Sequence, residues 1–351
     1  MNKPVKEETT ATLPQTRVRH VAAGEDDAGQ RLDNFLLRHL KGVPKSRVYR
    51  LLRKGEVRVN KKRAKPDYRL EAGDEVRLPP VRQAAEKAPV DINNADGLLG
   101  RLAAAIIYED DRLLVVNKPA GLAVHGGSGL DFGLIEALRR LRPDAPALDL
   151  IHRLDRDTSG CLLVAKRRSM LRAMHALLRE GQVEKQYLAL VQGKWRGGKI
   201  TQALEKNQMQ SGERMVKASA TGKASTSLFT PEQRFTDTTL MKVVIPTGRT
   251  HQIRVHAANA GHPVLGDDKY GDRAANKAIR KTGLKRMFLH AAQLSFIHPV
   301  SGEQLILEAP LPVELTSVLN KLKNVRHFRE GGNPPATKMD SRLRGNDEEL
   351  L

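Results

Sequence analysis

The amino-acid sequence predicts an α+β protein in which a small basic N-terminal domain precedes a larger mixed α/β domain built on an antiparallel sheet. The chain has 351 residues, of which 40% are hydrophobic, so it can form two domains with at least one sizeable core. From Ile106 to about Pro312, short β-rich runs alternate with a few helices. Residues 81–100 lack a sustained apolar period and separate this region from a compact unit with its own apolar pattern.

These patterns set the predicted domain boundaries. Both ends of the chain are polar and lack periodicity, which is typical of disordered segments. We therefore expect residues 1–18 to be disordered, 26–80 to form the small basic domain, 81–100 to be a linker, 101–315 to form the larger domain and 323–351 to be a disordered tail.

The N-terminal unit is predicted to contain two helices followed by a small sheet. Apolar residues recur at helical spacing from 32 to 40, and a second helix is expected to begin near Pro44 and to end at Gly55. Apolar and polar residues alternate from 57 to 60, as in a half-buried strand, and residues 73–78 offer a partner strand.

The charge of this unit points to a polyanionic partner. Positions 41–65 carry eleven Lys or Arg residues, with Glu56 as the only acid, and the whole chain has a formal net charge of +20. A solvated helix face is the alternative, but such faces normally carry acids that pair with the bases. We expect phosphate contacts from Lys45, Arg47, Arg50, Arg53, Lys54, Arg58, Lys61, Lys62 and Arg63.

Composition also bears on the compartment. The sequence has no run of 18 apolar residues, and its N-terminus lacks the apolar core of a signal peptide, so we expect a cytoplasmic protein without a membrane partner. Cys161 is the single cysteine and has apolar neighbours, which favours a buried structural thiol over a nucleophile.

The segment from Ile151 to Lys166 places one carboxylate, Asp155, among arginines and between two apolar runs. Residues 157–160 have turn chemistry and residues 161–165 read as a buried strand. Asp155 is therefore expected on a loop at a strand edge, where rigid scaffolds commonly present reactive groups. From this pattern alone, an Asp that merely caps a turn remains the alternative.

Two further elements follow in the larger domain. Residues 169–180 form the clearest predicted helix, with Gly181 as its C-cap. Tyr187 then alternates with Ala189 and Val191 on an expected strand, where core packing is the alternative to a functional role.

Four stretches, in order, resemble motifs of the RluA-type pseudouridine synthases, which isomerise uridine to pseudouridine in RNA. They are LLVVNKPAGLAVHGG at 113–127, HRLDRDTSG at 152–160, EKQYLALVQG at 184–193 and TGRTHQIRVHAANAGHPVLGD at 247–267. The N-terminal unit resembles an S4 RNA-binding domain. The resemblance covers roughly residues 26–315 and implies an α+β catalytic domain with an RNA-binding cleft across a long sheet.

The resemblance assigns roles to individual residues. It implies that Asp155 is the catalytic residue, that Arg254 is its basic partner and that Tyr187 packs on the target uracil and receives the C5 proton. Arg153, Arg249 and His251 are expected to contact RNA, and Asn117, Lys118 and Pro119 to serve structure and RNA contact. The reaction breaks the C1′–N1 bond, rotates the base and rejoins it through C5, so no metal or cofactor is expected.

Other chemistries have weaker support in the sequence. His251 and His256 are five residues apart, without an HExxH motif or a cysteine cluster, which disfavours zinc. Ser159 lies in Thr-Ser-Gly rather than in a GxSxG elbow, which disfavours a hydrolase. The glycine-rich residues 125–129 lack the spacing of a nucleotide-binding loop and read as a flexible turn.

The resemblance therefore predicts a cofactor-independent isomerase that modifies 23S ribosomal RNA or a large-subunit assembly intermediate. We expect the enzyme to be a monomer. A synthase with another target, of the synthase D type or acting on tRNA, is one alternative. A non-catalytic S4-type RNA-binding or ribosome-assembly factor is another.

Overall fold

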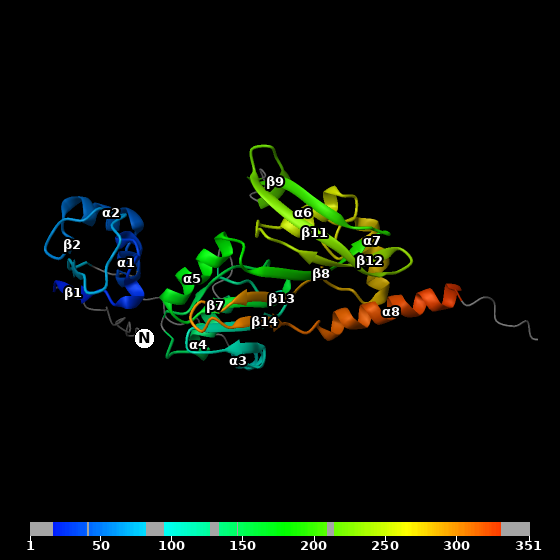
Figure 1. Cartoon of the computed structure of the whole chain (residues 1–351), viewed down its shortest axis with the longest axis horizontal. Coiled ribbons are helices and arrows are strands. Elements are labelled where there is room, and N and C mark those ends of the chain that lie inside the picture. Colours follow the sequence, from blue (N-terminus) through cyan, green and yellow to red (C-terminus); the bar gives the residue numbers. More distant parts are fainter. Residues whose placement is uncertain are drawn as a thin grey trace, which may run out of the picture.

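The computed structural model describes residues 17–40, 42–81, 95–126, 133–145, 147–208 and 214–330. Most of the expected N-terminal disorder, the middle of the expected linker, the expected turn at 127–129 and residues 331–351 lie outside the described residues. The small N-terminal unit lies at one end of the molecule and the C-terminal helix extends at the other (Figure 1).

The N-terminal unit has the predicted helices and hairpin. Its elements are β1 (Arg19–Ala22), η1 (Glu25–Asp27), α1 (Leu32–His39), α2 (Lys45–Lys54), β2 (Arg58–Val59) and β3 (Glu75–Leu78). Gly55 ends α2 with φ of +70°, as expected for a left-handed C-cap. The sheet order is β1-β3-β2, and the pairing of β2 with β3 confirms the predicted hairpin, whereas β1 was not predicted.

The larger domain is built on an 11-stranded sheet, with strands in the order β10-β9-β11-β12-β8-β13-β7-β5-β4 and with β14 and β6 paired beside β13 and β7. Within this sheet only β13 and β7 pair in parallel, so the predicted antiparallel character is confirmed. The strands are β4 (Ile106–Glu109), β5 (Leu113–Lys118), β6 (Asp149–Leu150), β7 (Ser159–Ala165), β8 (Glu184–Gln192), β9 (Gly198–Gln208), β10 (Arg214–Ala218), β11 (Lys223–Arg234), β12 (Thr238–Val244), β13 (Leu289–Ile297) and β14 (Gln304–Glu308).

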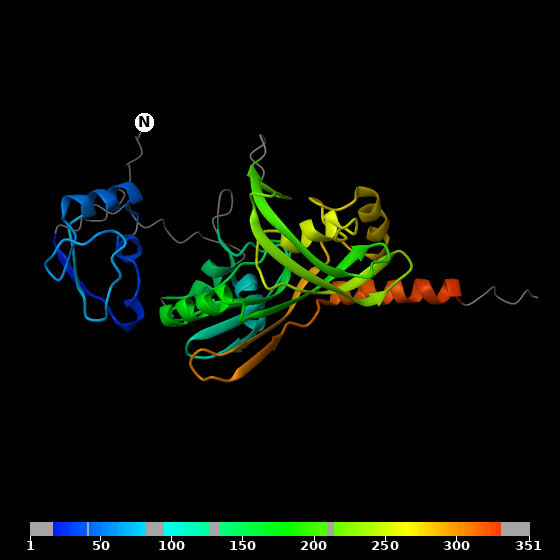
Figure 2. The same ribbon diagram turned by 45° about the horizontal axis from the view of Figure 1, so that its top comes forward.

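Helices cover both faces of this sheet (Figure 2). They are α3 (Ala95–Ala104), α4 (Leu134–Leu141), α5 (Arg168–Arg179), α6 (Gln252–Asn259), α7 (Arg273–Ile279), η2 (Arg280–Thr282) and α8 (Val313–Glu330). Because side chains alternate along a strand, Leu114 and Val116 of β5 pack with α3 and α4, while Leu113 and Val115 pack with α5. Helix α6 lies on the face of α3 and α4, and α7 and α8 pack on the other face.

The parallel pairing of β7 with β13 near the centre of the sheet depends on a glycine. Gly160 has φ of +111°, and a Cβ on it would lie 2.1 Å from the carbonyl oxygen of Ala291 in β13. No other residue fits this conformation and this approach, so the turn after Asp155 enters the sheet at one fixed position.

Two predicted boundaries differ from the structure. Residues 95–104 form α3, although the expected linker extended to residue 100, and α8 continues to Glu330, into the segment expected to be disordered from 323. Gly97 and Gly100 lower the helix propensity of α3, but its leucines pack on α4 and on the sheet. Within the described residues, no helix combines the length and apolarity needed to cross a membrane.

Candidate active site

The loop from 151 to 158 connects β6 to β7 and carries Asp155, as the sequence predicted. The loop is held against the strand that follows it, because the backbone N–H of Leu163 donates to Nε2 of His152 at 3.0 Å. The N–H of Thr158 donates to the carbonyl oxygen of Asp155 at 3.2 Å, which closes the turn. The backbone of Asp155 is thereby fixed from both sides.

Lys118 at the end of β5 anchors the same loop from below. The residue is fully buried, and its ammonium donates to the carbonyl oxygens of Pro119, Leu122 and Arg156, each at 2.9 Å. Burial lowers the pKa of Lys118 to about 7, although the charges of Asp157 and Asp155 oppose that shift. The expected RNA contact by Lys118 was wrong, because a fully buried side chain cannot reach a ligand; its role is structural.

Asp155 is paired with Arg254, which lies 99 residues further along the chain in α6. Nη1 of Arg254 donates to Oδ2 of Asp155 at 3.1 Å, and the Asp155 side chain is 18% exposed. The same guanidinium makes two shorter bonds to Asp267, from Nε at 2.7 Å and from Nη2 at 2.8 Å. Asp267 therefore fixes the plane of the guanidinium in a bidentate contact and leaves one N–H for Asp155.

The contact between Arg254 and Asp267 favours the charged form of both side chains. Burial opposes charge on Arg254, but the hydrogen bonds and charge of Asp267, followed by those of Asp155, raise the pKa of the guanidinium. Burial also disfavours the charged form of Asp267, whose side chain is completely buried, yet the contact with Arg254 lowers the pKa of that carboxyl. One cation is thus shared by two carboxylates, of which only Asp155 reaches solvent.

His251 approaches Asp155 from the other side. It immediately precedes α6 and adopts a left-handed backbone with φ of +54°, which is uncommon for a residue with a side chain. Nε2 of His251 lies 3.8 Å from Oδ1 of Asp155, and Nδ1 lies 2.8 Å from the hydroxyl of Tyr270. Burial lowers the pKa of His251, opposed by the charge of Asp155.

Tyr187 lies on β8 between β12 and β13, opposite Val243 and Ala291. Tyr187 is 7% exposed and packs among the apolar side chains of the main core cluster. Burial and the charge of Asp155 raise the pKa of the phenol, so that it is neutral around neutral pH.

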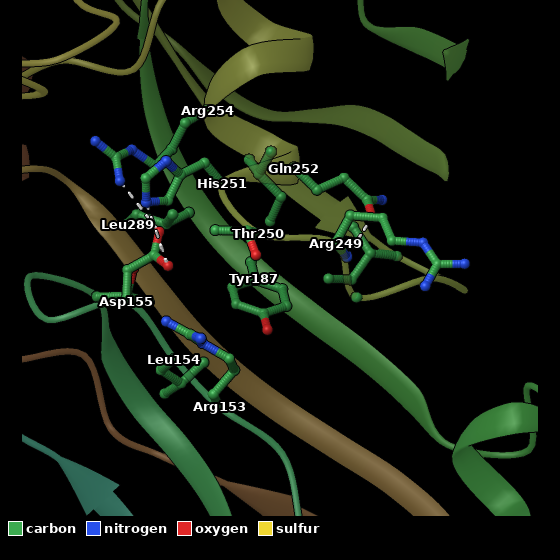
Figure 3. Close-up of a pocket in the computed structure, with 14 residues that line it drawn as sticks. Arg153, Leu154, Asp155, Tyr187, Arg249, Thr250, His251, Gln252, Arg254 and Leu289 are labelled. Atoms are coloured by element: carbon green, nitrogen blue, oxygen red, sulfur yellow. Dashed lines mark hydrogen bonds and ion pairs between the residues drawn. The ribbon is translucent and has the colours of Figure 1, made fainter. Parts of the chain in front are cut away.

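Asp155, Tyr187, His251 and Arg254 line one pocket (Figure 3). Its walls include Asp155, Tyr187, Arg254 and the apolar Leu154, Ile245, Ile253 and Leu289. On the other side of Asp155 a groove of about 480 Å³ has more basic than acidic residues on its walls. Besides Asp155 and Arg254, its charged residues are Arg153, Arg156, Lys269, Lys285, Arg286, Asp157, Asp267 and Asp268. Asp155, Arg153, His251 and Arg254 border both spaces, so the carboxylate sits where a narrow pocket meets a basic groove.

The residues expected to contact RNA fall in two places. On the N-terminal unit, Arg47 is half-buried and the other eight are exposed; they are Lys45, Arg50, Arg53, Lys54, Arg58, Lys61, Lys62 and Arg63. Arg153 and Arg249 are exposed beside the pocket, with Arg249 pointing away from Asp155 (Figure 3). His251 is instead held between Tyr270 and Asp155.

The other histidines and nucleophiles have structural partners. His256 is fully buried between the hydroxyls of Ser225 and Ser227, at 3.0 and 2.9 Å, so it does not face His251. Ser159 does contact a histidine, His290 at 2.9 Å, but both are buried and closed to a substrate. Within the described residues, no group of three or more His, Cys, Asp or Glu side chains could hold a metal ion.

Cys161 is buried, as predicted, and burial raises the pKa of its thiol to about 12.

Sequence reasoning missed Asp267 and Tyr270. Both belong to the loop between α6 and α7, and Asp267 ends one of the family-like motifs, although no role was assigned to it. The signal that could have identified Asp267 was its Gly-Asp context; an aspartate that accepts from the backbone N–H groups of Lys269 and Tyr270 is a common turn element.

Comparison with known proteins agrees with this geometry. A family model described as RNA pseudouridylate synthase matches residues 112–259, and an S4 domain model matches residues 30–76. Ribosomal large subunit pseudouridine synthase C of Escherichia coli strain K12 is 57% identical over 313 residues, which are 88% of this chain and 98% of that protein. The protein of the same name from Haemophilus ducreyi is 53% identical over 317 residues, covering 90% and 99%.

Among solved structures, human RNA Pseudouridylate Synthase Domain Containing 4 aligns with a TM-score of 0.55 and 26% identity, covering 66% of this chain and 97% of that one. The resemblance noted in the sequence is thereby confirmed, together with the S4 domain and the mixed α/β catalytic domain. The chain belongs to the RNA pseudouridylate synthase family, and it is a pseudouridine synthase with an N-terminal S4 domain.

Proposed function

We propose that this enzyme converts specific uridines of 23S ribosomal RNA to pseudouridine, with Asp155 as its catalytic residue. The substrate assignment rests on relatives that are named ribosomal large subunit pseudouridine synthase C and that are covered almost completely by this chain. The residue assignment rests on one observation: a partly exposed carboxylate, ion-paired to Arg254, stands at the junction of a pocket and a basic groove.

The groove and the pocket suit the two parts of a nucleotide. A target uridine in a paired or stacked region must be flipped out, which costs a few kcal/mol that backbone contacts must offset. The basic groove bordered by Arg153, Arg156, Lys269, Lys285 and Arg286 would receive the sugar-phosphate backbone. The pocket lined by Tyr187 and apolar side chains would receive the uracil, which places C1′ close to Asp155.

Asp155 would act on the ribose as an anion in one of two ways. In the first, a carboxylate oxygen attacks C1′, the C1′–N1 bond breaks and its electron pair leaves with uracil. In the second, the carboxylate removes the C2′ proton while the same C1′–N1 bond breaks, which leaves a glycal. In both, the uracil rotates and C5 bonds to C1′. In the first route C5 displaces the carboxylate oxygen from C1′, and in the second the protonated carboxyl returns its proton to C2′ of the glycal. The C5 proton is then removed and N1 is protonated, which restores the uracil ring and the free carboxylate.

An isotope experiment separates these routes. Deuterium at C2′ of the target uridine should slow the reaction only if that C–H bond breaks. A substantial primary isotope effect supports proton removal by Asp155, and an effect near unity supports attack at C1′.

Arg254 and Tyr187 would assist in different steps. Arg254 would hold Oδ2 of Asp155 through its Nη1 donor and so orient the carboxylate toward the ribose. Tyr187 would stack on the uracil and accept the C5 proton; because its neutral phenol is a weak base, this step depends on proximity to an activated C5–H.

The partner is proposed to be 23S rRNA or a large-subunit assembly intermediate, bound by a monomer in the cytoplasm. The S4 domain would supply affinity and position through phosphate contacts, and the catalytic cleft would read local RNA shape. Modification assays on naked rRNA and on isolated assembly intermediates separate the two substrates, and sedimentation of the free enzyme reports its oligomeric state.

The decisive experiment is complementation of a strain that lacks this gene, followed by mapping of pseudouridine in its RNA. Wild-type protein should restore specific 23S sites, whereas Asp155→Asn should bind RNA with unchanged affinity and restore none. Restoration of sites only in tRNA, or at the positions served by a synthase D-type enzyme, would replace the proposed substrate. Full modification by Asp155→Asn would refute the proposed catalytic residue, and a growth or assembly phenotype rescued by that variant would reveal a separate binding role.

A further inference from the structure

Tyr270, in the loop between α6 and α7, contacts both His251 and Arg254, the two side chains that approach the Asp155 carboxylate. Its hydroxyl lies 2.8 Å from Nδ1 of His251, and its ring lies edge-on to the His251 ring, with centroids 5.5 Å apart. The Arg254 guanidinium carbon stands 5.0 Å from the centre of the Tyr270 ring, within the range of a cation–π contact. The backbone N–H of Tyr270 donates to Asp267 at 3.1 Å, so the same carboxylate that holds Arg254 also holds this loop.

The contacts of the Tyr270 hydroxyl favour one direction for its hydrogen bond to His251. The backbone N–H of Val216 in β10 donates to the Tyr270 hydroxyl at 2.9 Å, and an amide N–H can only donate. The phenolic proton must then find an acceptor elsewhere. Among the described residues, Nδ1 of His251 is the acceptor that lies within reach of this hydroxyl.

Donation from the Tyr270 hydroxyl to Nδ1 implies one tautomer of the neutral imidazole. A neutral imidazole that accepts at Nδ1 carries its proton on Nε2, because the two ring nitrogens of the neutral form divide into one donor and one acceptor. Nε2 is the atom that faces Oδ1 of Asp155 at 3.8 Å. Burial lowers the pKa of His251 and so favours the neutral ring. The opposite tautomer would turn a lone pair toward the carboxylate.

We propose that Tyr270 is a positioning residue for the isomerisation: its hydroxyl selects the Nε2–H tautomer of His251 and thereby directs an N–H donor at the free oxygen of Asp155. Arg254 holds Oδ2 and His251 faces Oδ1, so each oxygen has its own donor group. The 3.8 Å separation is longer than a hydrogen bond, and a modest approach of the two groups on substrate binding closes it. This proposal rests on the catalytic role proposed for Asp155.

The strained backbone of His251 supports a designed orientation. A left-handed conformation at a non-glycine residue costs about 1 kcal/mol or more and persists where surrounding contacts enforce it. At His251 the contacts on the side chain are the Tyr270 hydroxyl and ring. The histidine therefore enters α6 in the one backbone conformation that brings its ring between Tyr270 and Asp155.

Tyr270→Phe tests the role of the hydroxyl alone, because the ring, its contact with Arg254 and the backbone bond to Asp267 remain possible. The matched control is Tyr108→Phe. Tyr108 lies on β4, an edge strand of the sheet, and its hydroxyl donates to Asp110 at 2.8 Å. We expect kcat of Tyr270→Phe to fall roughly 10-fold with KM for RNA nearly unchanged, since small losses of alignment act on the transition state. Tyr108→Phe should retain wild-type kcat and KM.

The tautomer itself can be observed. With ¹⁵N-labelled histidine, the His251 signals are identified by their loss in His251→Gln, and their shifts distinguish a protonated from an unprotonated ring nitrogen. We expect an unprotonated Nδ1 in wild-type protein and a mixture of tautomers in Tyr270→Phe. A wild-type Nδ1 that is protonated, or a tautomer unaltered by Tyr270→Phe, overturns the proposal whatever happens to activity.

A double-mutant cycle shows whether Tyr270 acts through His251. In the His251→Gln background, Tyr270→Phe should have little further effect on kcat, because the group it positions is gone. Independent, multiplicative losses would overturn the proposed pathway, and so would wild-type kcat in His251→Gln. Melting temperatures identify any variant that merely unfolds. The NMR result does not depend on Asp155, so full activity of Asp155→Asn would refute the proposed catalytic residue without altering the tautomer measurement.

Discussion

Arg254 divides its contacts unequally between the carboxylates of Asp267 and Asp155. Arg254 gives its two-pronged contact to Asp267 and only one N–H to Asp155. Asp267 is completely buried and so serves as the permanent counter-ion, whereas Asp155 remains partly exposed. The cation is thereby held in place by one acid and used by the other.

Loss of Arg254 should therefore damage stability as well as catalysis. Arg254→Met leaves the buried Asp267 without its cation, and breaking a buried pair in this way costs roughly 3 to 5 kcal/mol. Urea unfolding should show a decrease of that order in the free energy of unfolding, together with loss of modification activity. Arg254→Met combined with Asp267→Asn should regain part of the stability but no activity, because the unpaired charge is gone while Asp155 still lacks its partner. A double variant no more stable than Arg254→Met would contradict this explanation.

His152, in the loop that carries Asp155, makes the folding stability depend on pH. Burial, followed by the charge of Lys185, lowers the pKa of His152 to about 4, while an unfolded chain titrates near the ordinary value of 6.5. The neutral ring accepts the Leu163 N–H, so its contribution to stability is complete above about pH 6.5 and decreases progressively as the pH falls toward about 4.

Denaturant unfolding between pH 7.5 and pH 4.5 measures this contribution. His152→Gln retains a side-chain acceptor but cannot titrate, so its stability should fall less steeply with decreasing pH than that of the wild type. Parallel curves for His152→Gln and wild type would contradict the assignment.

How much of the site was predictable differs between residues. The position of Asp155 on a loop before a buried strand was predicted from local patterns, whereas its catalytic role and its pairing with Arg254 were expected from the family resemblance. Their contact joins positions 99 residues apart, and no periodicity reports on such a distance. Asp267 and Tyr270 were missed because their importance lies in contacts with α6 and β10 that exist only in the folded chain.

At the scale of elements, the basic surface of α2 and the β2–β3 hairpin is the feature that the sequence predicted most directly. Arg50, Arg53 and Lys54 are exposed, while Val48, Leu51 and Leu52 of the same helix are buried. Nothing in α2 supplies an acid to pair with these charges. The helix therefore presents its cations to solvent on one side and its apolar stripe to the core on the other.

Removal of those charges should change the salt dependence of RNA binding. If Arg50, Arg53 and Lys54 contact phosphates, log affinity falls linearly with log salt, and each lost contact reduces the slope magnitude by about 0.7 to 0.9. Arg50→Gln, Arg53→Gln and Lys54→Gln combined should thus flatten the slope by about 2 to 3, measured by filter binding or anisotropy over a salt series. Lys281→Gln combined with Lys321→Gln changes exposed residues of η2 and α8, outside the N-terminal unit, and should leave the slope unchanged. An equal effect of both sets would mean that net charge, and not this surface, governs binding.

Element boundaries were predicted where local signals are strong. Gly55 and Gly181 correctly predicted where α2 and α5 end, since both glycines adopt positive φ just after these helices. Residues 95–100 of α3 were assigned to the linker because residues 81–100 lack a sustained apolar period, yet packing on α4 overrides the low helix propensity of Gly97 and Gly100. Strand β1 was not predicted because it has only four residues and its partner strand, β3, lies more than 50 positions further along the chain.

At the scale of the whole molecule, an acidic turn joins two basic domains. Helix α5 begins at Arg168 after an N-cap residue, Arg167, that makes no side-chain cap bond. Asp26 of η1, in the N-terminal domain, takes this role: its carboxylate accepts from the Ser169 N–H at 3.3 Å and from the Ser169 hydroxyl at 2.9 Å. Arg172 donates to the carbonyl oxygen of Asp26 at 2.7 Å. The S4 domain is thus attached where the α5 dipole favours an anion.

This attachment should fix the distance between the basic surface of the S4 domain and the catalytic pocket. A lost N-cap costs roughly 0.5 to 2 kcal/mol, which is comparable to the whole free energy of a small interdomain contact. Asp26→Ala should therefore release the S4 domain from α5, raise the radius of gyration in small-angle scattering and accelerate hydrogen exchange at the Ser169 amide. Asp67→Ala, which removes an exposed acid elsewhere on the same domain, should change neither quantity. Because RNA must span both domains to benefit from both, the released domain should also weaken RNA binding while kcat at saturating RNA stays the same. Unchanged scattering and exchange in Asp26→Ala would show that other contacts hold the domains together; a fall in saturating kcat would show that the S4 domain takes part in the chemistry.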